Sequence, residues 1–130
     1  YFIAGEATLD GPSIVKTATL GYDGKGQARV SSEAELVAAL QNLNAPCIVE
    51  SVVPFARELS LVAVVGADRS VAFYDLVENE HRSGVLFRTR APAPGIARHQ
   101  TEQAEEYARR IAADLGYVGV FALELFELEN

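Results

Sequence analysis

Two apolar runs joined by a short polar turn constrain the fold of this chain more than any other feature of its sequence. Residues 58–66 (ELSLVAVVG) and 70–78 (SVAFYDLVE) are rich in β-branched and aromatic side chains, and they are separated by residues 67–69. Parallel strands need a crossover of a dozen or more residues, so a connection this short predicts an antiparallel β-hairpin.

Helical signals occur twice among further strand-like runs. Ser32 and Glu35 have the spacing of a capping box, and apolar residues follow at helical spacing, which predicts a helix over residues 32–43. A second amphipathic helix is predicted over residues 101–115, where Gly116 follows as a stop signal. Further strands are expected at residues 13–18, 27–30, 46–51, 85–91 and 117–128. Strands joined mostly by hairpins predict an α+β fold with a mainly antiparallel sheet and packed helices, rather than a doubly wound fold.

Charge and cysteine content exclude several classes of partner. The net charge is −7, so no overall basic field would attract nucleic acid or an anionic membrane surface. No apolar run reaches the roughly 18–20 residues that span a bilayer. Cys47 is the one cysteine, so no intrachain disulfide can form, and its apolar neighbours predict a buried strand residue. A lone cysteine suits a reducing cytosol, and the protein is expected to be cytoplasmic and to bind neither nucleic acid nor membrane.

A glycine-rich segment, residues 21–27 (GYDGKGQ), begins five residues after Lys16 and is the first candidate for a binding site. Its glycines permit sharp backbone turns, and the exposed N–H groups of such turns can surround an anion. Lys16 and Lys25 could add positive charge beside phosphate groups. The spacing matches neither a P-loop nor a dinucleotide-binding fingerprint. From composition alone, a flexible hairpin with its turn at Asp23 and Gly24 remains the alternative.

Three carboxylates and a histidine are further candidates. Glu50 and Glu124 alternate with apolar residues on their strands, and a carboxylate in such a row requires a partner because burying an unpaired charge is costly. Glu50 could accept a hydrogen bond from a ligand, or it could lie on an edge strand in contact with solvent. Glu124 could bind Mg²⁺ together with nucleotide phosphates, or it could be the buried partner of an Arg or Lys. Glu58 could instead have a capping role or form a surface ion pair, which would contribute little stability. His81, in the polar stretch 78–84 between two strands, could be exposed or could contact an anion.

Taken in order along the chain, these segments resemble one family. The chain is similar to the N5-carboxyaminoimidazole ribonucleotide synthases, which are ligases of the ATP-grasp superfamily, and the resemblance extends from about residue 14 to the C-terminus. The matching segments are GYDGKGQ at residues 21–27, CIVE at 47–50, RELS at 57–60, ENEHRSG at 78–84 and ELF at 124–126. The resemblance implies the central portion of an ATP-grasp fold.

The resemblance implies an ADP-forming ligase of de novo purine biosynthesis. ATP would phosphorylate bicarbonate to carboxyphosphate, and the amine of 5-aminoimidazole ribonucleotide would then capture the carboxyl group. ATP and Mg²⁺ would be the cofactors, bicarbonate and 5-aminoimidazole ribonucleotide the substrates, and the full-length protein a homodimer. Carboxyphosphate hydrolyses in water, so a mobile glycine-rich flap over the phosphates suits this chemistry.

The resemblance also implies a role for each candidate residue. Lys16 would contact ATP phosphate, Glu58 would hold the ribose hydroxyls, His81 would belong to the nucleotide site, and Glu124 would be the first Mg²⁺ ligand. The segment along adenine would comprise Glu50, Ser51, Val52 and Val53. The flap would comprise Gly21, Tyr22, Asp23, Gly24, Lys25, Gly26 and Gln27, of which Tyr22 and Asp23 would also act catalytically beside bicarbonate and the ribonucleotide.

The resemblance divides the chain in two and leaves alternatives open. Residues 1–53 would form the small lid subdomain with the flap, and residues 54–130 part of the larger subdomain. Flanking domains and a second metal-binding acid would lie outside the chain, so this stretch alone is expected to bind nucleotide weakly and not to turn over. One alternative is another ATP-grasp ligase, of the formate-dependent glycinamide ribonucleotide transformylase or biotin carboxylase type. The other is a non-catalytic interaction domain.

Overall fold

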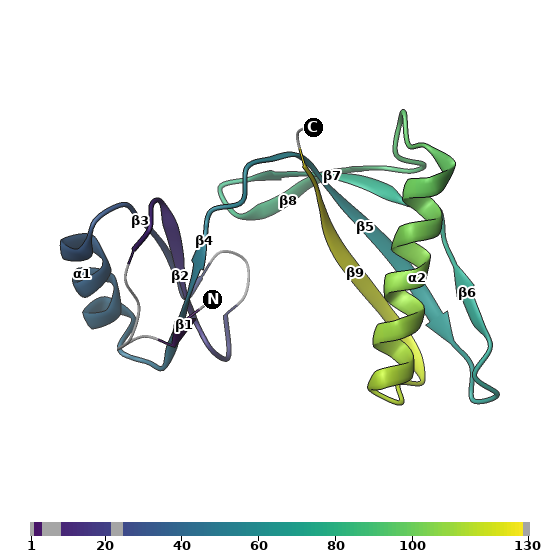
Figure 1. The fold of residues 1–130 in the computed structure, drawn as a ribbon, viewed down its shortest axis with the longest axis horizontal. Helices are drawn as coiled ribbons and strands as arrows, with labels where there is room; N and C mark the ends of the chain where they lie inside the picture. The colour runs from purple at the N-terminus through teal and green to yellow at the C-terminus, as the bar shows by residue number, and fades with distance from the viewer. Residues whose placement is uncertain (1, 4–8, 22–24, 129–130) are drawn as a thin grey trace. The chain divides into compact units, whose positions relative to one another are not determined.

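The computed structural model of the protein describes residues 2–3, 9–21 and 25–128. The chain divides into two compact units, of which unit 1 comprises Tyr1–Pro54 with Ser83–Val85, and unit 2 comprises Phe55–Arg82 with Leu86–Asn130. Each unit has its own sheet, its own helix and its own hydrophobic core (Figure 1).

Unit 1 contains a four-stranded antiparallel sheet with one face covered by a helix. The strand order is β1-β4-β2-β3, with bounds Phe2–Ile3 for β1, Cys47–Ser51 for β4, Ser13–Thr17 for β2 and Gln27–Val30 for β3. Side chains alternate along a strand, so Val15 and Val49 face the helix α1 (Glu33–Leu43), while Lys16 and Glu50 lie on the opposite face. The core consists of Val15, Val30, Leu36, Ala39, Cys47 and Val49.

The local predictions for unit 1 are confirmed. The Ser32 hydroxyl accepts a hydrogen bond from the Glu35 backbone N–H at 3.3 Å, which is one of the two bonds of a capping box. The Glu35 carboxylate accepts a hydrogen bond from the Ser31 N–H at 2.7 Å, one residue before the N-cap. Helix α1 ends at Asn44, whose left-handed φ of 44° reverses the chain. Strands β2 and β3 pair as an antiparallel hairpin, with Lys16 opposite Gln27. Cys47 is buried, as predicted for a structural cysteine.

Unit 2 contains a five-stranded sheet built around the long strand β5 (Phe55–Val65). Strand β9 (Gly119–Leu128) pairs with it antiparallel along its whole length. The other edge of β5 pairs with β6 (Val71–Phe73) and then β7 (Val77–Arg82), and β8 (Val85–Arg90) lies beyond β7.

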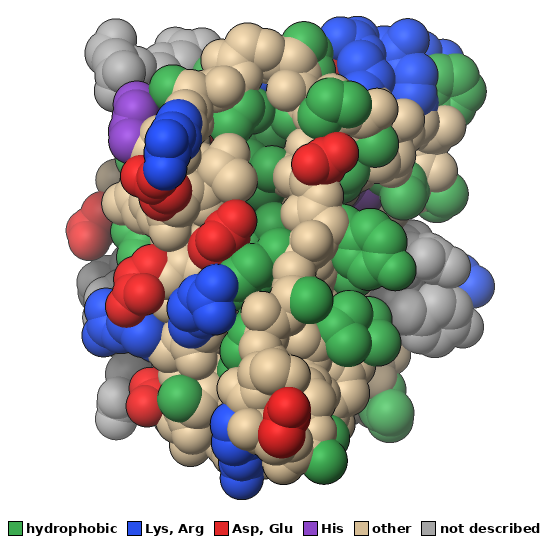
Figure 2. Space-filling model, turned by 90° about the vertical axis from the view of Figure 1, so that its right-hand side faces the viewer, with side chains coloured by type: hydrophobic (Ala, Val, Ile, Leu, Met, Phe, Trp, Pro, Cys, Tyr) green, Lys and Arg blue, Asp and Glu red, His purple; other side chains and the backbone are tan. Residues whose placement is uncertain are grey.

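Helix α2 (Arg98–Asp114) covers one face of β5 and β9 (Figure 1). Small side chains permit a close approach between helix and sheet, because the buried residues of α2 are Ala104, Ala108 and Ala112. The core of unit 2 comprises Ala104 and Ala108 of the helix together with residues of the sheet and loops, which are Leu59, Leu61, Ala63, Leu76 and Ala93. The larger apolar residues of the predicted helix face remain exposed; they are Tyr107 and Ile111 on α2 and Leu115 directly after it. Figure 2 shows hydrophobic side chains among charged ones on one face of the molecule.

The helix boundaries show how backbone groups at each end are satisfied. Helix α2 begins three residues before the predicted position, because the Gln100 side chain accepts a hydrogen bond from the Ala97 backbone N–H at 2.9 Å. At the other end, Gly116 has a φ of +58°, and the Tyr117 N–H donates to the Ala112 carbonyl at 2.9 Å. This is a Schellman motif, which confirms the predicted stop at Gly116.

Two predictions for the strands of unit 2 are wrong in part. The predicted single strand 70–78 is interrupted at residues 74–76, since Phe73 lies opposite Ala63 whereas Val77 lies opposite Ser60. Three residues, 74–76, therefore lie opposite the two residues 61–62 of β5. One extra residue on one strand of an antiparallel pair is a β-bulge. The stretch 78–84 was expected to be a polar connection, but β7 continues through most of it, and residues 83–84 form a tight turn into β8.

Within the described residues, no helix is long and apolar enough to cross a membrane.

Candidate functional site

The face of the unit 2 sheet that lies opposite α2 collects most of the candidate side chains of this unit. Glu58 and Ser60 alternate with the core residues Leu59 and Leu61 on β5, so their side chains lie on the face away from the helix. Neighbouring strands place partners beside them, since Asn79 lies opposite Glu58 and Glu124 lies opposite Ser60. We call this surface the open face of unit 2; it is defined by Glu58, Ser60, Asn79, His81, Thr89 and Glu124.

Glu58 and His81 are in direct contact on the open face. The Nδ1 atom of His81 contacts Oε2 of Glu58, and both side chains are partly buried, with 29% and 28% of their surface exposed. His81 belongs to strand β7, so the expectation that it lies in a loop between strands is wrong. The alternation of β7 directs Asn79 and His81 to the same face. The two residues assigned to the nucleotide in this unit are thus brought together.

A line of hydrogen bonds runs beside this pair and was missed by the sequence analysis. The Asn79 side-chain amide donates to the Ser60 hydroxyl at 2.6 Å, and the Thr89 hydroxyl donates to the Asn79 carbonyl oxygen at 2.8 Å. The available signal was the polar pair at period two in each strand, Glu58 with Ser60 and Asn79 with His81. This signal could not be used while residues 78–84 were interpreted as a connection.

Glu124 lies on the same open face and is exposed. The alternative that it is a buried partner of an Arg or Lys is therefore wrong, since the residues of its row on β9 are exposed while those of the other row pack into the core. Next in its row is Phe126, whose ring stacks on Phe55 with centroids 4.4 Å apart. Among the described residues, no three His, Cys, Asp or Glu side chains are grouped closely enough to hold a metal ion by themselves.

Lys16 and Glu50 form the corresponding feature of unit 1. Nζ of Lys16 lies 2.5 Å from Oε2 of Glu50, on the face of the sheet opposite α1. Gln27 lies opposite Lys16 on β3 and belongs to the same face. Strand β4 is flanked by β1 and β2, so the alternative that Glu50 lies on an edge strand is wrong. The partner that Glu50 requires is the lysine expected to bind phosphate.

The two ends of the glycine-rich segment lie close together beside Thr17. The Thr17 N–H donates to the Gly26 carbonyl at 2.8 Å. A Cβ on Gly26 would come within 2.7 Å of the Thr17 hydroxyl oxygen, and one on Gly21 would come within 3.3 Å of it. The described ends of the segment also include Lys25, which is exposed. The tip, with Tyr22, Asp23 and Gly24, lies outside the described residues.

The segment expected to run along adenine follows the end of β4. Ser51 is the last residue of the strand, and Val52 and Val53 follow it without regular structure. The Val52 N–H already donates to the Pro12 carbonyl at 2.9 Å. Recognition of a base edge by backbone groups of this segment would therefore use other groups than this N–H.

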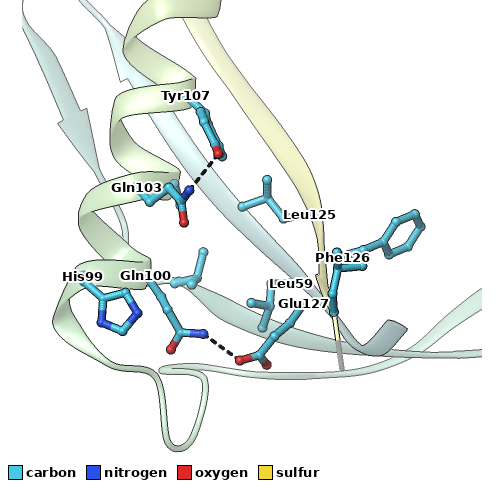
Figure 3. Close-up of a pocket in the computed structure, with 11 residues that line it drawn as sticks. Leu59, His99, Gln100, Gln103, Tyr107, Leu125, Phe126 and Glu127 are labelled. Atoms are coloured by element: carbon cyan, nitrogen blue, oxygen red, sulfur yellow. Dashed lines mark hydrogen bonds between the residues drawn. The ribbon is translucent and has the colours of Figure 1, made fainter. Parts of the chain in front are cut away.

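A cavity of about 400 Å³ lies on the other side of the unit 2 sheet, between α2 and β9 (Figure 3). Its polar side chains bind one another, since Gln100 donates to Glu127 at 2.6 Å and Gln103 donates to Tyr107 at 2.7 Å. The Phe126 ring points away from the cavity, whereas Glu127 points toward Gln100. None of the candidate site residues lines this cavity, although Leu59, Leu125 and Phe126 come from the segments that resemble the family.

A charged cluster beside this cavity joins the strands on the helix side. Arg57 bonds to the carboxylates of Glu127 and Glu78 and to the carbonyl oxygen of Pro94. The Arg57 side chain and then Gln100 hold the pKa of the Glu127 carboxyl below its ordinary value. The hydrogen bonds from Glu127 and Glu78 raise the pKa of Arg57, so the guanidinium stays charged. This cluster joins β5 to β7 and β9, the strands whose other face carries Glu58, Asn79 and Glu124.

Comparisons with known proteins agree with this architecture. The ATP-grasp domain family matches residues 2–130. The chain is 44% identical over 129 residues to the N5-carboxyaminoimidazole ribonucleotide synthase of Pseudomonas aeruginosa, covering 98% of this chain and 35% of that protein. It is 35% identical, with a TM-score of 0.84, to the N5-carboxyaminoimidazole synthetase of Staphylococcus aureus complexed with ADP, over 95% of this chain and 32% of that one. It is 30% identical, with a TM-score of 0.75, to the Aspergillus clavatus N5-carboxyaminoimidazole synthase in complex with ADP and 5-aminoimidazole ribonucleotide, over 91% and 30% of the two chains.

The match to the family extends over nearly all of the sequence, although the chain spans about a third of the length of the curated relatives it matches. Its antiparallel sheets with packed helices agree with the α+β fold predicted from the sequence. The chain belongs to the ATP-grasp domain family.

Proposed function

We propose that the complete protein containing this chain is an N5-carboxyaminoimidazole ribonucleotide synthase and that this chain is its ATP-binding part. Residues 1–53 would be the lid subdomain and residues 54–130 part of the larger subdomain. The observation that carries the proposal is the placement of the candidates. Among the described residues, the sheet face opposite each unit's helix carries side chains that the resemblance assigns to ATP and Mg²⁺, where a ligand can reach them: in unit 1 Lys16, Gln27 and Glu50, and in unit 2 Glu58, His81 and Glu124.

In unit 1, Lys16 would neutralise negative charge on the ATP phosphates. Its ammonium is paired with Glu50 in the structure, and both groups are more than one-third exposed, so exchanging one anion for another costs little. Once Lys16 contacts phosphate, the Glu50 carboxylate would be available to accept a hydrogen bond from the adenine amine. The backbone of residues 51–53 would follow the base edge.

In unit 2, Glu58 would accept hydrogen bonds from the ribose hydroxyls. A carboxylate has two oxygens and accepts only, which suits a pair of neighbouring hydroxyl donors. His81 contacts one oxygen of Glu58 and so fixes the orientation of the carboxylate. This arrangement supports a nucleotide-binding role for both residues.

Glu124 would bind Mg²⁺. The residues present fit this ion, because Mg²⁺ prefers oxygen ligands and usually takes one or two carboxylates together with phosphates and water. Glu124 supplies one exposed carboxylate on the open face. When bound, the cation would neutralise charge on the phosphate oxygens, and Glu124 would hold it against the sheet.

The segment of residues 21–27 would close over the phosphates, and Tyr22 and Asp23 would act beside bicarbonate and the ribonucleotide. A bicarbonate oxygen would form a bond to the γ-phosphorus of ATP as the bond to ADP breaks. The amine of 5-aminoimidazole ribonucleotide would then attack the carboxyl carbon, and phosphate would leave. Exclusion of water by the flap would protect carboxyphosphate from hydrolysis.

We further propose that the complete protein is a cytoplasmic homodimer.

The complete protein tests the proposal in an assay of ADP formation with each substrate omitted in turn. We expect rapid ADP formation only when bicarbonate and 5-aminoimidazole ribonucleotide are both present. Stimulation by formate with glycinamide ribonucleotide, or by biotin with bicarbonate, would instead assign the protein to another ATP-grasp ligase. Absence of ADP formation under every condition would favour a non-catalytic interaction domain.

A further inference from the structure

Three polar side chains form a continuous line across strands β5, β7 and β8 on the open face of unit 2. Thr89 donates to the Asn79 carbonyl oxygen at 2.8 Å, and the Asn79 amide nitrogen donates to the Ser60 hydroxyl oxygen at 2.6 Å. Ser60 is a buried polar residue, with 7% of its surface exposed. The Asn79–Ser60 bond is partly buried and the Thr89–Asn79 bond is exposed, so Ser60 is the member for which a missing partner would be most costly.

The direction of the hydrogen bonds determines what Ser60 can still do. An amide side chain has one accepting and one donating end. Because the accepting end of Asn79 receives the Thr89 hydroxyl, the donating end is turned toward Ser60. Ser60 therefore acts as an acceptor for Asn79, and its own hydroxyl proton remains to be donated to a further acceptor.

An acceptor lies next to Ser60 on the neighbouring strand. Glu124 is directly opposite Ser60 in the β5–β9 pairing. Directly opposite residues of an antiparallel pair have Cβ atoms about 4.5–5.5 Å apart and project from the same face. A carboxylate offers acceptor positions only. The Ser60 hydroxyl is thus placed to donate to the Glu124 carboxylate.

We propose that Ser60, Asn79 and Thr89 are positioning residues that hold the Glu124 carboxylate in the orientation in which it binds a divalent cation. This inference rests on the proposed function, in which Glu124 is a cation ligand. In this arrangement one carboxylate oxygen would accept the Ser60 proton, and the other would be available to bind the cation. Hydrogen bonds from neighbouring groups to a ligating carboxylate fix its orientation, and their loss typically weakens metal binding 10–100-fold.

The inference is tested by cation binding in the complete protein at saturating ADP. Mn²⁺ is the probe, because it also prefers oxygen ligands and its free concentration can be followed by electron paramagnetic resonance. We expect Ser60→Ala to raise the Kd for Mn²⁺ about tenfold and Thr89→Val to raise it about threefold, since Thr89 acts through two intervening residues. Binding of ADP without a divalent cation should change less than about twofold in both variants, because the line does not contact the nucleotide in this account.

Matched variants separate this outcome from a general loss of structure. Thr101→Val makes the same substitution on α2, on the other side of the sheet, and should leave the Kd for Mn²⁺ unchanged. Thr89 lies on an exposed strand, so Thr89→Val keeps the test valid if Ser60→Ala does not fold. Equal Mn²⁺ binding by the parent, Thr89→Val and any folded Ser60→Ala protein would overturn the inference. If Glu124→Gln still weakens Mn²⁺ binding in that case, the proposed function stands; a parent that binds no ADP would instead remove the proposed function itself.

Discussion

The charged residues on the sheet faces opposite the helices contribute little to the stability of the fold. Lys16 and Glu50 are 39% and 37% exposed, and ion pairs of this kind contribute only about 0–1 kcal/mol to folding. Glu58 and His81 are less exposed, but their pair also faces away from the core. The side chains that stabilise unit 2 electrostatically are found on the helix side, where Arg57 joins three segments.

Glu127 makes the stability of unit 2 sensitive to acid. Its pKa lies below the ordinary value of 4.5 because Arg57, and then Gln100, stabilise the ionised carboxyl. An acid whose pKa is lower in the folded than in the unfolded protein adds to the free energy of unfolding at a pH above its pKa in the unfolded protein. This contribution is lost as the pH falls through its pKa in the folded protein. We expect Glu127→Gln to reduce the free energy of unfolding by roughly 1–3 kcal/mol at pH 7, and the deficit to shrink as the pH falls below 4.5. Urea unfolding at several pH values measures both quantities.

The control for this prediction is Glu105→Gln. Glu105 lies 3.8 Å from Arg109 on the same helix, at i,i+4 spacing, and such a pair contributes only a few tenths of a kcal/mol. Its effect should therefore be small at every pH. A deficit for Glu127→Gln that persists unchanged at acidic pH would show that the loss is one of packing rather than of charge.

At the scale of elements, the helices and strands with regularly spaced apolar residues were predicted correctly, and those without such spacing were not. Both helices and the hairpin around residues 67–69 have strong local signals, and each is present in the structure. Strand β7 has almost none, because its sequence VENEHR contains a single apolar residue. Its strand conformation depends on pairing with β5 and on ion pairs such as Glu80 with Arg88, at 2.6 Å, across the β7–β8 hairpin. Such non-local partners cannot be identified from a short window of sequence, and the line through Asn79 was missed for the same reason.

The hairpin of β2 and β3 requires glycine at position 26. Gly26 has a φ of +75°, and a Cβ there would approach the Thr17 hydroxyl oxygen to 2.7 Å. We expect Gly26→Ala to destabilise the hairpin by roughly 2 kcal/mol through backbone strain and this close approach. Hydrogen exchange of the Thr17 amide, which donates to the Gly26 carbonyl, measures the local opening and should become faster by more than about tenfold.

Gly95 provides a control that separates the two causes. Its φ is +67°, but a Cβ there would meet no atom within 4 Å, so Gly95→Ala isolates the backbone strain. Adding Thr17→Ala to Gly26→Ala should restore the part of the loss that is due to the close approach. If the Gly26 and Gly95 variants were equally destabilised, contact with Thr17 would have no role in the hairpin.

At the scale of the whole molecule, two units with separate cores carry different parts of the proposed nucleotide chemistry. Lys16, assigned to phosphate, belongs to unit 1, and Glu58, assigned to ribose, belongs to unit 2. The sequence could predict these residues because their motifs resemble a family of ligases, whereas composition and spacing alone left each of them with an alternative. The structure removed the alternatives of an edge strand for Glu50 and a buried pair for Glu124. Their contacts with ATP remain predictions.

The most direct test of the central claim is calorimetric titration of Mg-ATP into the complete protein and its variants. Lys16→Met and Glu58→Ala each remove one charged contact, from different units, and should weaken ATP binding about 10–100-fold. Arg98→Met and Glu102→Ala are the matched controls, because these residues form an exposed pair on α2, and both should bind as the parent does. Saturable binding that is weakened only in the first pair of variants is the predicted result. A parent that does not bind ATP, or variants of Lys16 and Glu58 that bind it as tightly as the controls, would contradict the account.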